Sequence, residues 1–233
     1  MSSAIKYMPE LTDANLALAL KHVADVLEKL YGVRVWKRKA PIDELMLTLL
    51  SQNTNDRNRD LAYSRLRERW QTWAEVASAD VNEIMEAIRP AGLFRQKSER
   101  MKSILAWVEQ TFGGFHIDPV QDMNDEDAIK LLSSQKGIGV KTAAVTLAFS
   151  LNRDLCPVDT HVHRISKRLG WVEPSASAES TFYQLKPNMP KNRAAPFHLN
   201  ILRFGREICT ARKPKCGECP LWDRCVWEKK SPR

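Results

Sequence analysis

Apolar residues recur every three or four positions along most of the chain, which is the spacing of one face of an α-helix. In the first such segment the polar pair Thr12-Asp13 can cap the start and Gly32 can end the helix. Further segments with helical spacing run over 42–50, 56–70, 80–88, 95–111 and 197–208. No stretch alternates with a period of two, as a half-buried strand would. The pattern predicts an all-α protein with a looser Ser-, Pro- and Ala-rich segment over 171–196.

The most informative stretch runs from Asp125 to Arg168 and reads DEDAIKLLSSQKGIGVKTAAVTLAFSLNRDLCPVDTHVHRISKR. It predicts a helix, a turn built on Gly137 and Gly139, a second helix and, after a short return loop, a third helix capped by Asp159. Two glycines one residue apart permit backbone angles and close approaches that a side chain would block. Amides at the start of the second helix can then bind an anion.

This turn has two interpretations. A bare Gly-x-Gly between helices is most often a tight turn without a ligand. Here Lys136 and Lys141 flank the turn on a basic chain, which favours contact with DNA phosphates. The sharper hypothesis is a helix-hairpin-helix motif over 125–151.

Lys141 and Asp159 each stand at the start of a predicted helix. The helix dipole there repels a cation, so the pKa of Lys141 is expected to fall and a neutral amine can act as a nucleophile. The alternative is a lysine that faces solvent or contacts phosphate. Asp159 is a good N-cap, and an ionised carboxylate there can also stabilise an oxocarbenium-like sugar or accept a proton from an amine. The link over 152–158 is long enough for both side chains to face one cleft.

The chain of 233 residues is long enough for one large or two small domains, and it carries a formal net charge of +8. This charge favours a polyanionic partner, although many basic proteins only have solvated faces. No apolar run approaches the roughly 18 residues needed to cross a bilayer, and the first residues lack the pattern of a signal peptide. We expect a cytoplasmic or nucleoid-associated protein with no membrane contact.

Four of the five cysteines fall within one short C-terminal segment: Cys209, Cys216, Cys219 and Cys225. In a chain without a secretion signal this clustering favours a metal site over disulfides. Thiolates at this spacing can hold zinc or a [4Fe–4S] cluster, and composition does not separate the two. Cys156 stands apart and is expected to be a small core residue. The loop between the first two cysteines could bring three cations to a phosphate backbone: Arg212, Lys213 and Lys215.

The segment LLSSQKGIGVKTAAVTLAFS followed by CPVDTHVHR resembles the helix-hairpin-helix, Gly/Pro-rich-loop-and-Asp superfamily of DNA glycosylases. The cysteine spacing Cys-x6-Cys-x2-Cys-x5-Cys matches the iron–sulfur signature of its endonuclease III branch. The resemblance covers about 41–225. It implies two helical lobes with DNA in a cleft between them and a damaged nucleotide flipped out of the stack.

With the helical pattern, the resemblance suggests a division of the chain into two domains. A six-helix barrel domain would occupy 36–151 and contain the hairpin. Residues 1–35 would join 152–233 in a helical iron–sulfur domain, with the cluster loop at 209–225.

The resemblance also implies residue roles. Lys141 matches the family lysine that attacks the sugar carbon, expels the base and cleaves the strand by β-elimination through a Schiff base. Asp159 matches the essential aspartate, and the four cysteines would hold a [4Fe–4S] cluster rather than zinc. Branch members that lack the lysine remove a base without efficient strand cleavage, so Lys141 implies a bifunctional glycosylase and lyase.

Relatives in this family insert side chains into the gap that the flipped base leaves. The turn at Gln52 and Asn53 lies where that plug sits, and Asn53 aligns best with the plug glutamine of endonuclease III. Leu93 matches the leucine wedge, and His161 matches a histidine near the site. Without the resemblance, these residues would be a polar turn, a core leucine and a helix-start residue.

Two departures from the family pattern bear on function. Gln135-Lys136 replaces the usual Leu-Pro pair before the first hairpin glycine, which adds a cation near the expected phosphate site. The pair Gln52-Asn53 differs from endonuclease III and resembles the corresponding turn of plant 5-methylcytosine glycosylases. The second departure weakens any transfer of base specificity.

Three functional hypotheses follow. The first is a monomeric DNA glycosylase and lyase of base excision repair, acting on damaged and mainly oxidised pyrimidines in double-stranded DNA. The second is the same chemistry on mismatched thymine, methylated bases or abasic sites. The third is a non-catalytic helix-hairpin-helix DNA-binding protein with a structural metal, in which the carboxylate of Asp159 would be dispensable.

Overall fold

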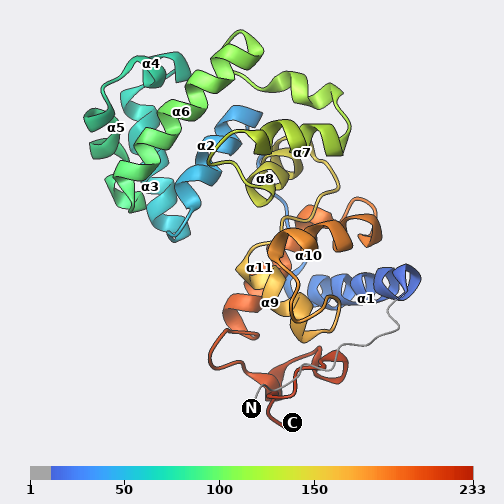
Figure 1. The fold of residues 1–233 in the computed structure, drawn as a ribbon. Coiled ribbons are helices and arrows are strands. Elements are labelled where there is room, and N and C mark those ends of the chain that lie inside the picture. Colours follow the sequence, from blue (N-terminus) through green and yellow to red (C-terminus); the bar gives the residue numbers. More distant parts are fainter. Residues whose placement is uncertain (1–11, 233) are drawn as a thin grey trace. The chain divides into compact units, whose positions relative to one another are not determined.

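The computed structural model describes residues 12–232. Residues 1–11 and 233, the two ends of the predicted iron–sulfur domain, lie outside the described residues. Every regular element over 12–232 is helical, which confirms the all-α prediction (Figure 1). The chain divides into two compact units, one of residues 38–151 and one that combines 12–37 with 152–232. The boundary lies between Lys37 and Arg38, whereas the sequence analysis placed it between Val35 and Trp36.

The unit of residues 38–151 is built around one buried helix. Its α-helices are α2 (Pro41–Ser51), α3 (Asp56–Arg69), α4 (Trp73–Ser78), α5 (Val81–Ile88), α6 (Phe94–Phe112), α7 (Asp125–Ser134) and α8 (Val140–Leu151). In α8 every residue from Thr142 to Ser150 is buried. A helix that is apolar all round needs neighbours on every side, and here α2 and α7 both pack against it.

Side-chain caps decide where several of these helices begin. Asn55 Oδ1 accepts the backbone N–H of Asn58 at 2.9 Å at the start of α3. The short helix α4 begins with a capping box between Thr72 and Glu75, in which each side chain bonds the other residue's backbone. The prediction of six helices in this part of the chain missed α4, because six helical residues are too few to show a period.

The second unit joins the N-terminal helix to the C-terminal part of the chain. Its α-helices are α1 (Asp13–Tyr31), α9 (Thr160–Arg168), α10 (Ala178–Leu185) and α11 (Ala194–Glu207). α11 packs against both α1 and α9. Asn200 Nδ2 donates to the carbonyl of Gly32 at 3.0 Å, and Arg193 pairs with Asp25 and Glu28 at 2.7 and 2.8 Å. These polar contacts join segments more than 160 positions apart in the sequence.

Helix α10 corrects the sequence analysis, because it lies in the segment expected to be loose. Ser177 Oγ accepts the backbone N–H of Ser180 at 3.0 Å and caps its start. Phe182 and Leu185, three positions apart, are buried. Two apolar anchors in eight residues do not establish a period, so this helix depends on its tertiary packing.

Within residues 12–232, no helix combines the length and apolar character that crossing a membrane would require.

Candidate active site and cysteine cluster

In the turn between α7 and α8, Gly137 has the backbone that the glycine pair predicted, whereas the φ of Gly139 is not positive. Gly137 has φ +101°, a region that side chains rarely allow. The buried Ile138 donates its N–H to the carbonyl of Gln135 at 3.0 Å and closes the turn. A Cβ on Gly137 would lie 2.4 Å from Cδ of Arg100, whereas one on Gly139 would meet nothing within 4 Å. Gly137 is therefore required both by its backbone angle and by the packing of Arg100.

Lys141 lies in the first turn of α8, directly after this hairpin, and is partly exposed. A carboxylate that the sequence analysis did not single out, Glu44 of α2, stands in its electrostatic field. Burial raises the pKa of Glu44, and the positive charges of Lys39, Arg59 and Lys141 act against that rise. Glu44 was missed because it lies in an apolar helix far from the hairpin in sequence.

Asp159 is the N-cap of α9, as predicted. One carboxylate oxygen, Oδ1, accepts the backbone N–H groups of His161 and Val162, both at 2.8 Å. These bonds fix the carboxylate at the positive end of the helix. Asp159 belongs to the unit of 12–37 and 152–232, whereas Lys141 belongs to the other unit.

The ring of His161 packs against Gly205 of α11, where an added Cβ would lie 2.6 Å from Nδ1. Nη2 of Arg164 lies 3.1 Å from the same Nδ1. The same Nη2 donates to the carbonyls of Gly205 and Cys209 at 2.9 and 2.7 Å. Burial lowers the pKa of His161, with the charge of Asp159 acting in the opposite direction. Burial therefore favours the neutral ring of His161 over the charged one.

Asn53 and Leu93, the predicted gap-filling residues, share an uncommon backbone conformation. Asn53 has φ +52° and Leu93 has φ +47°, and over residues 12–232 the only other non-glycine residues with positive φ are Asn152 and Asn192. Asparagine tolerates this region, but leucine rarely adopts it. Both side chains are exposed, Leu93 to 49%. The core alternative for Leu93 is therefore wrong.

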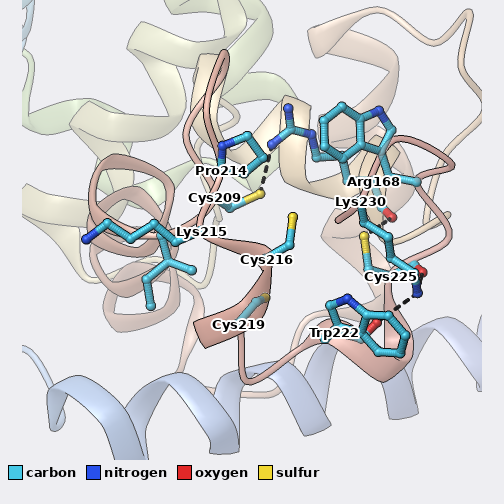
Figure 2. Close-up of a pocket in the computed structure, with 11 residues that line it drawn as sticks. Arg168, Cys209, Pro214, Lys215, Cys216, Cys219, Trp222, Cys225 and Lys230 are labelled. Atoms are coloured by element: carbon cyan, nitrogen blue, oxygen red, sulfur yellow. Dashed lines mark hydrogen bonds between the residues drawn. The ribbon is translucent and has the colours of Figure 1, made fainter. Parts of the chain in front are cut away.

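The four clustered cysteines surround a small cavity after α11. Cys209 follows that helix, and the other three lie at the short turns Cys216–Glu218 and Trp222–Arg224 (Figure 2). None of the four forms a disulfide. Arg168 of α9 also lines the cavity: its Nη1 donates to Cys209 Sγ at 3.1 Å, and its carbonyl accepts from Cys225 Sγ at 3.3 Å. Cys156 is buried elsewhere, as predicted for a core residue.

The donor set fits an iron–sulfur cluster. Four cysteine sulfurs line one small cavity, and four thiolates are the ligand set that holds a [4Fe–4S] cluster. The guanidinium of Arg168 supplies a donor to one sulfur. Within residues 12–232, no three His, Cys, Asp or Glu side chains converge on a single ion. A four-iron cluster does not require such convergence, because each thiolate binds a different iron.

The loop between Cys209 and Cys216 exposes Arg212, Lys213 and Lys215. Arg168 also holds the backbone of this loop, donating to the carbonyls of Thr210 and Ala211 at 2.8 and 3.0 Å. The contact of the three cations with DNA stays a prediction, as do the contacts of Lys136 and Gly139 at the hairpin.

Comparisons with known proteins identify the family. The family model described as HhH-GPD superfamily base excision DNA repair protein matches residues 46–191. This chain belongs to the HhH-GPD superfamily. A second family model, the iron–sulfur binding domain of endonuclease III, matches residues 209–225.

Similar proteins cover most of this HhH-GPD chain. Endonuclease III of Thermotoga maritima is 35% identical over 81% of this chain and 84% of its own. A solved structure described as a trapped endonuclease III–DNA covalent intermediate is 26% identical, with a TM-score of 0.77, over 90% of this chain and 95% of that one. DNA glycosylase/AP lyase ROS1 of Arabidopsis thaliana is 28% identical over 66% of this chain and 12% of its own.

This HhH-GPD protein is thus an endonuclease III-like DNA glycosylase of base excision repair, and it carries a [4Fe–4S] cluster in residues 209–225. The iron–sulfur alternative left open by cysteine spacing is confirmed over zinc by the match to the iron–sulfur domain. When bound, the cluster supplies a fixed anchor for the loops that end at its thiolates.

Gly137→Ala should lower the free energy of unfolding by about 1–3 kcal/mol, because a left-handed backbone and the packing of Arg100 both oppose a methyl group. Gly139→Ala is the matched control, since its Cβ would enter open space and its φ is not positive. It should change stability by less than about 0.5 kcal/mol. Urea denaturation measures both, and equal midpoints would contradict the assignment of Gly137.

Purified protein should be brown, with about four iron and four acid-labile sulfide per chain. Cys216→Ala should lose most of both, because a ligand is removed, whereas Cys156→Ala should retain them since that residue is buried away from the cavity. Metal analysis and visible absorbance provide the readout. A colourless wild type with stoichiometric zinc would overturn the cofactor assignment.

Proposed function

We propose that this protein is a bifunctional glycosylase and lyase that removes oxidised pyrimidines from duplex DNA and then cleaves the strand by β-elimination. The observation that carries the proposal is the place of Lys141, in the first turn of α8 directly behind the hairpin turn. In the sequence resemblance, Lys141 matches the family's nucleophilic lysine. A structure at 26% identity, described as a trapped covalent intermediate of endonuclease III and DNA, supports covalent chemistry.

In the proposed reaction, Nζ of Lys141 attacks C1′ of the damaged nucleotide as a neutral amine. The N–C1′ bond forms, the glycosidic bond breaks and the base leaves with its electron pair and a proton. The sugar ring then opens to a Schiff base. Loss of a C2′ proton breaks the C3′–O bond and cuts the strand, and water releases the lysine.

Two features of the helix ends support this chemistry. The positive end of α8 acts against the ammonium form of Lys141, and the neighbouring charge of Glu44 acts in the opposite direction. Asp159, held by two backbone amides at the start of α9, offers a carboxylate to the oxocarbenium-like charge that develops on the sugar. We propose that His161, two positions further along the chain, contacts the DNA near the same site.

DNA binding is proposed to use backbone contacts and inserted side chains. Lys136, Gly137 and Gly139 would hold a phosphate at the start of α8. The exposed cations Arg212, Lys213 and Lys215 would hold another part of the backbone, so affinity should fall with salt. Gln52, Asn53 and Leu93 would fill the gap left by the flipped nucleotide. We propose Cys209, Cys216, Cys219 and Cys225 as the cluster ligands, with the protein acting as a monomer.

A second substrate class has its own support. The pair Gln52-Asn53 resembles the corresponding turn of plant 5-methylcytosine glycosylases, and the Arabidopsis ROS1 protein is similar over 66% of this chain. A methylated cytosine would then replace the oxidised pyrimidine with the same Lys141 chemistry.

Sodium borohydride should trap a covalent adduct between the wild-type protein and lesion DNA, because it reduces the Schiff base to a stable amine. Lys141→Gln should form no adduct and lose strand cleavage by at least about 100-fold. Lys130→Gln, on the exposed face of α7, is the matched control and should trap like the wild type. Normal trapping by Lys141→Gln would rule out this nucleophile.

A panel of duplexes with thymine glycol, 5-methylcytosine, a G·T mismatch or an abasic site would rank the substrates.

Asp159→Ser should keep the N-cap and lose the charge, because a serine oxygen also accepts the backbone amides of a helix start. We expect stability within about 0.5 kcal/mol of the wild type and base removal slower by at least about 100-fold. Asp159→Ala should lose about 1 kcal/mol as well. Thermal unfolding and single-turnover base release separate the two roles. Base release at the wild-type rate by Asp159→Ser would leave capping as the only role.

A further inference from the structure

Three polar side chains on one face of α6 together reach three segments of the proposed DNA-binding surface: the 51–55 turn, the Leu93 segment and the hairpin. Lys97, Arg100 and Ser103 are spaced three apart, so they lie on the same side of the helix. All three, and all the groups they contact, belong to the unit of residues 38–151.

Lys97 is a buried cation whose hydrogen bonds are to backbone carbonyls. Only 2% of its surface is exposed. Nζ donates to the carbonyl of Leu50 at 2.8 Å and to that of Ala91 at 2.7 Å. Burying an ammonium is unfavourable unless its donors are satisfied, so the site is built for these two acceptors. Burial lowers the pKa of Lys97 to about 8, which leaves it mainly protonated at neutral pH.

The two acceptors stand directly before the two segments that carry the proposed gap-filling residues. Leu50 is in the last turn of α2, just before the turn with Gln52 and Asn53. Ala91 ends the short helix Arg89–Ala91, just before Leu93. Each segment holds one non-glycine residue with positive φ. Such conformations persist only where the surrounding structure over-determines them, and one ammonium supplies a bond to each side.

Arg100 and Ser103 extend the same face to the hairpin. Nη1 of Arg100 donates to Oε1 of Gln52 at 3.1 Å, and its side chain fills the space against Gly137. Oγ of Ser103 accepts from Nε2 of Gln135 at 3.1 Å. Gln135 is one of the two residues that replace the usual Leu-Pro pair of the family, so this contact is a feature of this chain.

We propose that Lys97 is a positioning residue, which ties the 51–55 turn and the Leu93 segment together so that their side chains enter the DNA gap as one pre-formed unit. This inference rests on the proposed function for its DNA readout, but not for its structural one. If both segments are already ordered, binding DNA does not carry the entropic cost of ordering them. Arg100 is expected to couple the hairpin to the same unit through Gln52.

Lys97→Met tests the link, because it keeps the length and apolar stem of the side chain and removes all donors. Lys102→Met is the matched control on the same helix, since Lys102 donates to the carbonyls of Ala77 and Ala79, outside the DNA-binding segments. Hydrogen exchange should rise at the amides of 51–54 and 91–94 in Lys97→Met only. It should rise near 77–80 in the control only. Unchanged protection of both DNA-binding segments in Lys97→Met would overturn the proposal.

The DNA readout uses duplexes with 2-aminopurine next to a damaged base. Lys97→Met should slow the fluorescence change of nucleotide flipping and single-turnover base release by about 10- to 100-fold. Its affinity for undamaged duplex, which depends on phosphate contacts, should stay within about twofold of the wild type. In the Leu93→Ala background the same change should cost much less, because the residue it positions is already gone. Equal cost in both backgrounds would show a general structural role instead.

Arg100→Met keeps the inference testable if Lys97→Met does not fold. It removes the bond to Gln52 and leaves both bonds of Lys97. Hydrogen exchange should then rise at 51–54 and at the hairpin while 91–94 stays protected by Lys97. A rise at 91–94 instead would contradict the assignment of that segment to Lys97. If the wild type releases no base and traps no DNA, the proposed function fails, and the exchange data still decide the role of Lys97.

Discussion

The burial of α8 is the constraint on which the unit of residues 38–151 depends. Every residue from Thr142 to Ser150 is enclosed, so the helix has almost no freedom to shift or rotate. Two of its buried hydroxyls are satisfied within the helix, since Thr146 Oγ1 donates to the carbonyl of Thr142 at 3.0 Å and Ser150 donates to that of Thr146. A helix fixed along its length also fixes its first turn. Lys141 and the hairpin turn at Gly137 stand at that end.

Helix α6 connects the segments of the proposed DNA-binding surface. Its polar face contacts the 51–55 turn, the Leu93 segment and the hairpin. The uncommon backbone of Leu93 is sustained by this network, as Lys97 donates its side chain to Ala91 and its backbone N–H to Leu93 at 2.9 Å. Strain of this kind concentrates where side chains are held ready for a ligand.

In the other unit, Arg168 connects several segments in the same way. Its guanidinium contacts the sulfur of Cys209, two carbonyls of the loop after Cys209 and the face of Trp227, whose ring centre is 3.9 Å away. An arginine suits this place because its planar group can donate in several directions while stacking on a ring. The cluster region and the loop with Arg212 and Lys213 are therefore ordered by the same side chain of α9.

The sequence by itself determined what depends on residues close together in the chain. Caps such as Thr12 and Asp159 predicted helix starts, and the spacing of the cysteines predicted a metal site, because these interactions span only a few positions. The choice of iron–sulfur over zinc came from the resemblance to the endonuclease III branch. The helices α4 and α10 were missed because each is too short to show a period.

Only the tertiary structure decided the environment of Lys97, which as a lysine in an amphipathic helix would be expected to face solvent. Its bond to Leu50 spans 47 positions and the bond of Arg100 to Gln52 spans 48. Such contacts arise from how packed helices bring distant segments together, and no local pattern of residues encodes them.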